Sequence, residues 1–206
     1  MDRTLVFSLG SPFARKIRIV LAEKQLAYAE DIRPGFREVE ELRALTPTLM
    51  LPVLIDGGET IFESNLIIRY LLTRYAETAP VADPRPLAPQ MTRAGRELAD
   101  EKILAVIETF ANTMVNVRHV LADSPEASYM RRQQSRLATC LDWLEAELTD
   151  DGFWPGTLSA MDINLVCPLD YALKRNVYDW RGRPKIDALH ARLSERASFL
   201  ATAIPQ

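Results

Sequence analysis

Cysteine and histidine are scarce in this chain, whose 206 residues include two of each. Cys140 and Cys167 stand far apart, so they form neither a zinc-ligand pair nor the disulfide framework of a secreted protein. His119 and His190 are isolated in the sequence, and no acid–base partner stands beside either of them. We therefore expect no metal site, and a reducing compartment rather than a secreted location.

Long apolar runs and an excess of one charge are also missing. Arg or Glu interrupts each apolar run well before the roughly 18 residues that suggest a membrane span. The apolar stretch after Met1-Asp2-Arg3 is too short for the core of a signal peptide. The formal net charge is −3 and is spread evenly, which predicts no basic face for nucleic acid. We expect a soluble, cytoplasmic protein that binds neither membranes nor nucleic acid.

A proline-rich segment divides the chain. Four of the 13 prolines fall within ten residues: Pro80, Pro84, Pro86 and Pro89. Proline does not continue a helix, and the segment lacks hydrophobic periodicity, so we predict a linker over residues 77–89. The prediction places one domain at 1–76 and a second at 90–206.

Strand and helix patterns alternate before the linker. Phe13, Ile17, Val20 and Leu21 recur at helical spacing after Ser11-Pro12. The apolar patterns predict strands over 5–7, 28–32, 53–55 and 59–62, and helices from residue 12 and over 64–75. Asp56-Gly57-Gly58 suits the loop of an antiparallel hairpin. The expected architecture is a small mixed sheet with helices.

Only helical patterns follow the linker. They cover residues 90–121, a second stretch with an apolar stripe, and 184–203; the stripe is Met130, Leu137, Leu141, Leu144 and Leu148. Ser159-Ala160-Met161-Asp162 has the form of a capping box, with Leu158 and Ile163 as its hydrophobic staple. Trp143 and Trp154 lie among the apolar positions and are expected to pack. The second half is therefore predicted to be all-α.

Three local motifs have both a structural and a functional interpretation. Ser11-Pro12 suits a helix N-cap followed by proline, but helix amides and a hydroxyl also stabilise an anion such as a thiolate. Glu63-Ser64 begins a helix, where the helix dipole favours an acidic residue. Leu51-Pro52 precedes a strand, and the base rate for a cis bond there is only about 5–6%. Each motif alone is explained by capping or by a turn.

In their order along the chain, the motifs resemble the cytosolic glutathione transferase family. The resemblance joins the Ser-Pro-Phe-Ala-Arg-Lys helix start, the Leu-Pro-Val-Leu strand, the Glu-Ser helix start, the linker and the capping box. It covers nearly the whole chain, and Ser11–Lys24 is most similar to serine-type bacterial and plant tau-like members. It implies an α/β plus all-α fold, in which residues 1–76 form a thioredoxin-like, glutathione-binding domain and 90–206 form an all-helical domain.

The resemblance also implies a glutathione site. Ser11 would hydrogen-bond the sulfur and lower its pKa, which is near 8.5 in a free thiol. The backbone of Leu51, before a cis Pro52, would pair with the cysteinyl moiety. Glu63 and Ser64 would hold the γ-glutamyl amine and carboxylate. We include Phe13 and Met50 in the same site by position.

Two departures from the family pattern bear on chemistry. Ser11-Pro12-Phe13-Ala14 contains no cysteine, which excludes the dithiol exchange of thioredoxin-fold redox proteins. Many family members carry Lys where this chain has Met50, and that Lys helps to hold the glycyl carboxylate. Arg33 and Arg37, in the preceding loop, are the available replacements.

The implied function is conjugation of glutathione, as cosubstrate, to a small apolar electrophile, or a related glutathione-dependent reaction. Phe13, Phe110, Met114 and Arg118 are expected to line the acceptor pocket between the domains, the last three from their spacing on the long helix. The resemblance further implies a homodimer without a metal cofactor.

A different class of function remains open. Some proteins of this fold act as non-catalytic binding or scaffold modules, including regulators that contact the transcription machinery. Met50 favours that alternative, whereas Ser11, Glu63 and Ser64 favour the enzyme.

Overall fold

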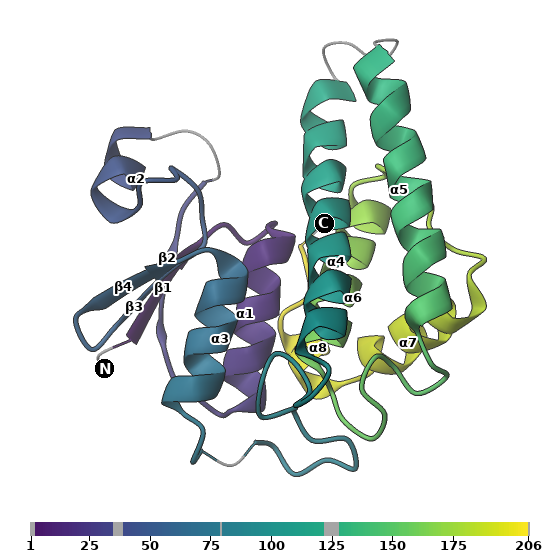
Figure 1. The fold of residues 1–206 in the computed structure, drawn as a ribbon. Coiled ribbons are helices and arrows are strands. Elements are labelled where there is room, and N and C mark those ends of the chain that lie inside the picture. Colours follow the sequence, from purple (N-terminus) through teal and green to yellow (C-terminus); the bar gives the residue numbers. More distant parts are fainter. Residues whose placement is uncertain (1–2, 35–38, 79, 122–127, 206) are drawn as a thin grey trace.

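The computed structural model describes residues 3–34, 39–78, 80–121 and 128–205 (Figure 1). Its first half contains β1 (Arg3–Phe7), α1 (Pro12–Glu23), β2 (Ala29–Ile32), α2 (Val39–Leu45), β3 (Val53–Asp56), β4 (Glu59–Phe62) and α3 (Ser64–Arg74). Its second half contains α4 (Glu97–Leu121), α5 (Ser128–Glu147), α6 (Ala160–Lys174), α7 (Pro184–Ser194) and α8 (Ala197–Ala201). In the described ranges all strands precede α3, which confirms the predicted change from mixed to all-helical structure.

The sheet has the strand order β2-β1-β3-β4. β1 pairs in parallel with β2 and antiparallel with β3, and β3 pairs antiparallel with β4. Leu5, Val6 and Phe7 of β1 are buried, as a continuous apolar run in a central strand predicts. α1 and α3 pack side by side against this sheet (Figure 1).

The helical half is built around α6. Nearly all of its side chains are buried, because α1 contacts it from the sheet half and α4 contacts it from the helical half. α4 and α5 lie side by side as the two long helices in Figure 1. The predicted stripe on α5 is buried from Met130 to Leu144, whereas Trp143 is 37% exposed, so the prediction that Trp143 packs inside was wrong.

The long helix α4 begins later than the residue 90 that the sequence pattern predicts. It starts at Glu97 because Gly95 takes a positive φ of 76°, which interrupts a helix, and Asp100 binds back to the turn. The Asp100 carboxylate accepts from the backbone N–H of Arg93 at 2.7 Å and from its Nε at 3.0 Å. Local turn chemistry therefore outweighs the helix propensity of residues 90–96.

Buried polar contacts fasten the two halves together. Arg15 of α1 pairs with Asp170 of α6 and donates to the carbonyl of Phe199 at 3.2 Å. His190 Nε2 lies 2.6 Å from the other oxygen of Asp170, so the histidine that looks isolated in the sequence has a carboxylate partner in space. Burial acts to raise the pKa of Asp170, but the contacts with His190 and Arg15 hold it below its ordinary value.

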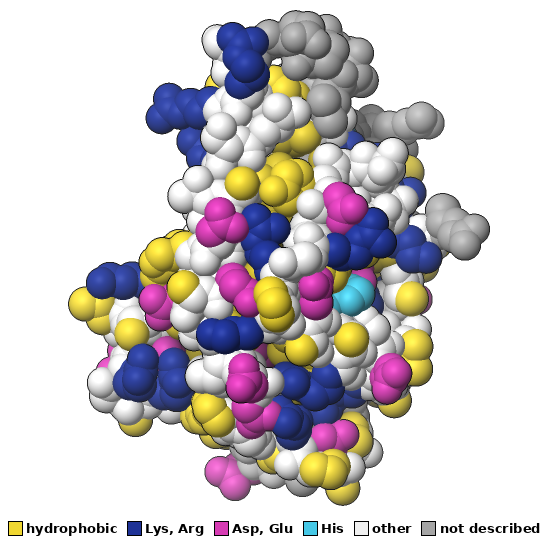
Figure 2. All heavy atoms as spheres, turned by 90° about the vertical axis from the view of Figure 1, so that its right-hand side faces the viewer, with side chains coloured by type: hydrophobic (Ala, Val, Ile, Leu, Met, Phe, Trp, Pro, Cys, Tyr) yellow, Lys and Arg dark blue, Asp and Glu magenta, His cyan; other side chains and the backbone are white. Residues whose placement is uncertain are grey.

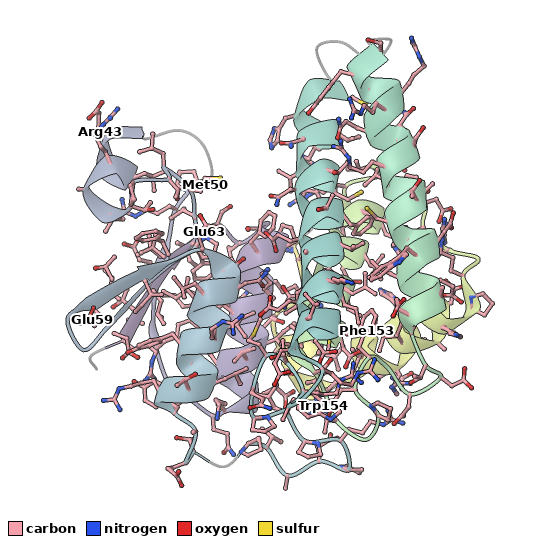
Figure 3. The ribbon with its side chains drawn as sticks, in the orientation of Figure 1. Arg43, Met50, Glu59, Glu63, Phe153 and Trp154 are labelled. Carbon is pink, nitrogen blue, oxygen red and sulfur yellow. The ribbon has the colours of Figure 1, made fainter. Side chains whose placement is uncertain are left out.

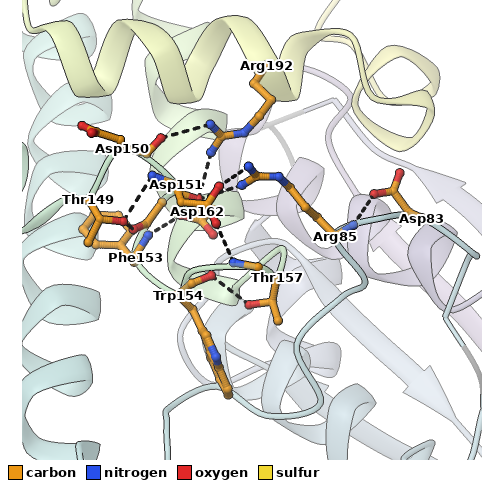
Figure 4. A network of polar contacts seen from close by, with 12 residues as sticks. Asp83, Arg85, Thr149, Asp150, Asp151, Phe153, Trp154, Thr157, Asp162 and Arg192 are labelled. Carbon is orange, nitrogen blue, oxygen red and sulfur yellow. Dashed lines mark hydrogen bonds and ion pairs between the residues drawn. The ribbon is translucent and has the colours of Figure 1, made fainter.

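The capping box begins α6 as predicted, and Figure 4 shows its Asp162 beside Phe153, whose N–H donates to it. The Ser159 Oγ accepts from Asp162 N at 3.1 Å, and the Asp162 carboxylate accepts from Ser159 N at 2.9 Å and from Phe153 N at 3.0 Å. The staple residues Leu158 and Ile163 are both buried. Burial raises the pKa of Asp162, and the hydrogen bonds from Phe153 and Ser159 oppose that rise.

Replacing Asp162 with alanine should lower the free energy of unfolding by about 2 kcal/mol, because buried N–H groups lose their acceptor. Ser159→Ala removes the cap and the hydrogen bond from the Ser159 hydroxyl to the Asp162 carboxylate, and should cost about 1 kcal/mol. Chemical denaturation measures both values. Equal midpoints for the two variants and the parent chain would show that this network does not stabilise the helix.

None of the helices in the described ranges is both long and apolar enough to span a bilayer. Within the same ranges, no group of three or more His, Cys, Asp or Glu side chains is arranged to hold a metal ion. On the face shown in Figure 2, acidic and basic side chains are interspersed over most of the helical half. That face therefore carries mixed charge.

Candidate active site

Ser11 caps the start of α1. Its φ and ψ of −79° and 125° are extended, and its Oγ accepts from the backbone N–H of Ala14 at 3.2 Å. Pro12 occupies the first helical turn, where a missing N–H costs nothing. That turn contains no acidic residue, so its positive end is not offset by a local charge. The geometry suits an anion at the Ser11 hydroxyl.

Strand register brings the Leu51–Pro52 bond to the same end of the sheet. Val53 pairs with Val6, so residues 51–52 lie beside the end of β1, just before the loop that leads to Ser11. The Leu51–Pro52 bond is cis, which confirms the expectation from the family resemblance against the base rate for X–Pro bonds. Pro52 is buried and Leu51 is half-buried.

Glu63 and Ser64 reach this end through the hairpin. Phe62 pairs with Val53, so Glu63 follows directly beside Pro52. Glu63 has a φ of 66°, which is uncommon for a residue with a Cβ and is typical of functional positions. Its exposed carboxylate makes no capping hydrogen bond to α3, and Ser64 behind it is buried. Glu63 is therefore available to a ligand.

Met50 lies at the same end of the sheet. Arg33, which could replace the lysine that many family members carry at this position, is already paired with carboxylates. Figure 3 places Met50 and Glu63 where α3 begins, away from Glu59 on the hairpin. Met50 is 53% exposed. Arg33 lines a small pocket with Leu51 and Glu41, but its guanidinium pairs with both Glu41 and Asp31.

The Arg33 guanidinium is already paired with two carboxylates. The hydrogen bond from Arg33 holds the pKa of Asp31 below its ordinary value. Arg37, the other replacement considered, lies outside the described residues.

A buried ammonium lies behind the site. Lys16, in the second turn of α1, donates to Asn65 Oδ1 at 2.9 Å, Asn164 Oδ1 at 2.6 Å and Glu108 Oε2 at 3.2 Å. Burial lowers the pKa of Lys16, and Glu108 opposes that effect. The ammonium joins α1, α3, α4 and α6, and its α3 partner directly follows Ser64. Sequence reasoning missed this network; the only signal was a lysine beside the apolar helix face.

The residues expected to line the acceptor pocket separate into two groups. Phe110 and Met114 are fully buried in the core of the helical half. Arg118, one turn further along α4, is exposed, and Phe13 is half-buried with its ring 5.5 Å from the Lys16 Nζ. The structure therefore brings Ser11, Leu51, Glu63 and Ser64 to one end of the sheet and leaves Phe110 and Met114 inside the protein.

The fold and this group of residues define a thioredoxin-like domain joined to a helical domain. Family models described as the N-terminal and the C-terminal domain of glutathione S-transferase match residues 5–79 and 127–192, which together exceed half of the chain. The chain belongs to the glutathione S-transferase family.

Similar full-length proteins support this assignment. The chain is 27% identical to "Glutathione S-transferase 3" of Zea mays over 95% of this chain and 91% of that protein. It is 29% identical to the "Uncharacterized GST-like protein YibF" of Escherichia coli K12 over 98% of each chain. A crystal structure of a glutathione S-transferase from Methylobacillus flagellatus with glutathione bound superimposes with a TM-score of 0.75, at 26% identity over 98% of this chain and 100% of that one.

Proposed function

We propose that this protein is a serine-type glutathione transferase that joins the thiol of glutathione to a small electrophile. The observation that carries the proposal is the convergence of the Ser11 hydroxyl, the Leu51 backbone and the exposed Glu63 carboxylate at one end of the sheet. The glutathione in the Methylobacillus flagellatus relative supports the same cosubstrate. Residues 1–76 would hold glutathione, and residues 90–206 would hold most of the second substrate.

The assigned roles follow from the charges of glutathione. Glu63 would accept from the γ-glutamyl ammonium, and Ser64 with the start of α3 would donate to the γ-glutamyl carboxylate. Ser11 and the start of α1 would stabilise the thiolate. The glycyl carboxylate would lack the lysine contact, because Met50 is uncharged and Arg33 is paired, at a cost of about 1.5–3 kcal/mol in binding. On the family's pattern, we also propose a cytoplasmic homodimer.

Retention on immobilised glutathione tests the site. The parent chain should be retained at low ionic strength and eluted by free glutathione, whereas Glu63→Ala should pass through because the ammonium loses its partner. Glu59→Ala is the matched control, since Glu59 is also exposed but lies on the hairpin (Figure 3). Equal retention of all three proteins would remove Glu63 from the site, and failure of the parent chain to bind would favour the non-catalytic module.

A further inference from the structure

One arginine side chain lies over the Tyr171 ring, and the charge of a second, beside the loop that precedes Ser11, also acts on Tyr171. Arg175 follows α6, and its guanidinium lies so close to Gly10 that a Cβ built there would stand 2.8 Å from Nη2. Arg118 of α4 places its guanidinium carbon 6.0 Å from the centroid of the Tyr171 ring. We call Arg118, Tyr171 and Arg175 the arginine cluster. It joins α4 and α6 to the loop that carries the proposed thiol site.

The arginine cluster has no acidic partner among the described residues. Arginines that connect elements elsewhere are paired with carboxylates, as in Arg15–Asp170, Arg93–Asp100 and Arg196–Glu23. Neither Arg118 nor Arg175 forms such a pair within the described ranges, where the Tyr171 hydroxyl also makes no hydrogen bond. Within the part of the chain that the structure describes, the guanidinium groups of Arg118 and Arg175 thus have no carboxylate partner, and the Tyr171 hydroxyl has no acceptor.

The three side chains act on one another electrostatically. Tyr171 is 6% exposed, and burial raises the pKa of its hydroxyl, although the charges of Arg118 and Arg175 oppose the rise. The hydroxyl therefore stays protonated at neutral pH and can donate a hydrogen bond. The positive charge of Arg175 is also favoured by the helix dipole at the C-terminal end of α6. That effect does not explain Arg118, which comes from another helix.

The position of the arginine cluster relates it to the second substrate. Gly10 is the residue before Ser11, and consecutive Cα atoms are about 3.8 Å apart. A molecule attacked by a thiolate at Ser11 would therefore lie within reach of the Arg175 guanidinium. The absence of a side chain at Gly10 is what permits that guanidinium to lie against the loop.

We propose that the second substrate carries a carboxylate, which the arginine cluster binds while the electrophilic carbon faces the thiol at Ser11. The proposal rests on the proposed transferase function and changes the acceptor from a purely apolar molecule to an amphipathic one. A guanidinium matches a carboxylate with two parallel hydrogen bonds, which orients the ligand as well as binding it.

Two matched electrophiles test the proposal: 4-chloro-3-nitrobenzoate and its methyl ester, each with glutathione. With either probe the sulfur–carbon bond forms, the carbon–chlorine bond breaks, chloride leaves, and the thiol proton passes to solvent. Each kcat/KM is divided by the uncatalysed rate of the same probe, which removes the difference in intrinsic reactivity. The proteins are the parent chain, Arg118→Gln, Arg175→Gln and the double variant, with Lys174→Gln as the control. Lys174 is an exposed cation next to Arg175 in sequence, so its replacement makes the same charge change.

The double variant should lose about 30-fold in normalised kcat/KM for the benzoate and change less than about twofold for the ester. Lys174→Gln should alter neither value. Thermal melting checks that the variants are folded. The substitutions of Arg118 and Arg175 should both be tolerated, because Arg118 is exposed and Arg175 is half-buried. Equal losses for acid and ester, or an unchanged rate for the acid, would overturn the proposal.

A binding measurement separates this inference from the proposed function. Isothermal titration with 4-nitrobenzoate should show binding that weakens about tenfold in the double variant, whereas 4-nitrobenzamide should show no such difference. One outcome is that the parent chain turns over neither electrophile while the double variant still weakens the binding of 4-nitrobenzoate and not of 4-nitrobenzamide. In that case the transferase function fails and the carboxylate site stands. If the two ligands behave alike, the carboxylate site fails. Loss of glutathione retention in the double variant would also overturn it, because the arginines would then serve the carboxylates of glutathione itself.

Discussion

Turnover of glutathione by the Ser11→Ala variant is expected to fall by about 10²-fold at slightly acidic pH, with a much smaller loss of binding. A free thiol has a pKa near 8.5, so little thiolate exists at that pH without a donor to the sulfur. The Ser11 Oγ already accepts from Ala14 N, which leaves its hydroxyl hydrogen free to donate to sulfur. The start of α1 persists in the variant, so the dipole retains part of the stabilisation.

Ultraviolet absorbance of the thiolate, followed against pH with glutathione bound, measures the effect directly. The apparent pKa of bound glutathione should rise in Ser11→Ala and stay near the parent value in Glu63→Ala, which instead weakens binding. Ser159→Ala is the control, because it removes a serine N-cap, at 3.1 Å rather than 3.2 Å, from the start of another helix, α6. If Ser11→Ala and Ser159→Ala behaved alike, Ser11 would be a helix cap and nothing more.

The parts of the fold that local patterns encode were predictable. The strand run Leu5–Phe7, the Asp56-Gly57-Gly58 turn and the Ser159 capping box each combine residue type with fixed spacing, and the structure contains all three. The cis bond at Leu51–Pro52 is a different case. Its local base rate points to trans, and only the order of motifs along the whole chain predicted it.

Contacts between distant segments were not predictable from one sequence. His190 lies 20 residues from Asp170, and Arg175 meets Gly10 only because α6 packs against α1. No periodicity marks such pairs, since they depend on how the helices pack and not on spacing within one helix. The same reason places Phe110 and Met114 inside the core: their spacing correctly predicts one helix face, but not which neighbour covers it.

Lys16 shows how a local pattern misleads about burial. A lysine in an amphipathic helix is ordinarily assigned to the solvated face, yet Lys16 is 2% exposed. Its burial is partly compensated by partners from three other helices, Asn65, Glu108 and Asn164, none of which the helix itself predicts. Buried charges require such partners, so the network is as much a part of the interface between the halves as its apolar contacts are.

The Lys16→Met variant is expected to lose about 3–5 kcal/mol of unfolding free energy. Methionine preserves most of the side-chain length, so the loss reflects the ammonium and not a cavity. Without it, the Asn164 oxygen loses its shortest contact, and Asn65, next to Ser64, loses one of its anchors. The KM for glutathione should therefore rise as well. Lys102→Met, at an exposed lysine of α4, is the matched control and should leave both quantities unchanged.

The pH dependence of stability gives this prediction a second readout. Because burial lowers the pKa of Lys16, the unfolded chain binds more protons than the native chain between that lowered value and 10.5. The unfolding free energy of the parent chain should accordingly rise with pH across that interval. Burial also lowers the pKa of Lys24, so Lys24 adds a rise of the unfolding free energy with pH in both proteins. Lys16→Met should thus show a smaller rise of the unfolding free energy with pH. If both proteins had the same slope and the same denaturation midpoint, the ammonium would make no net contribution to the stability of the junction between the two halves.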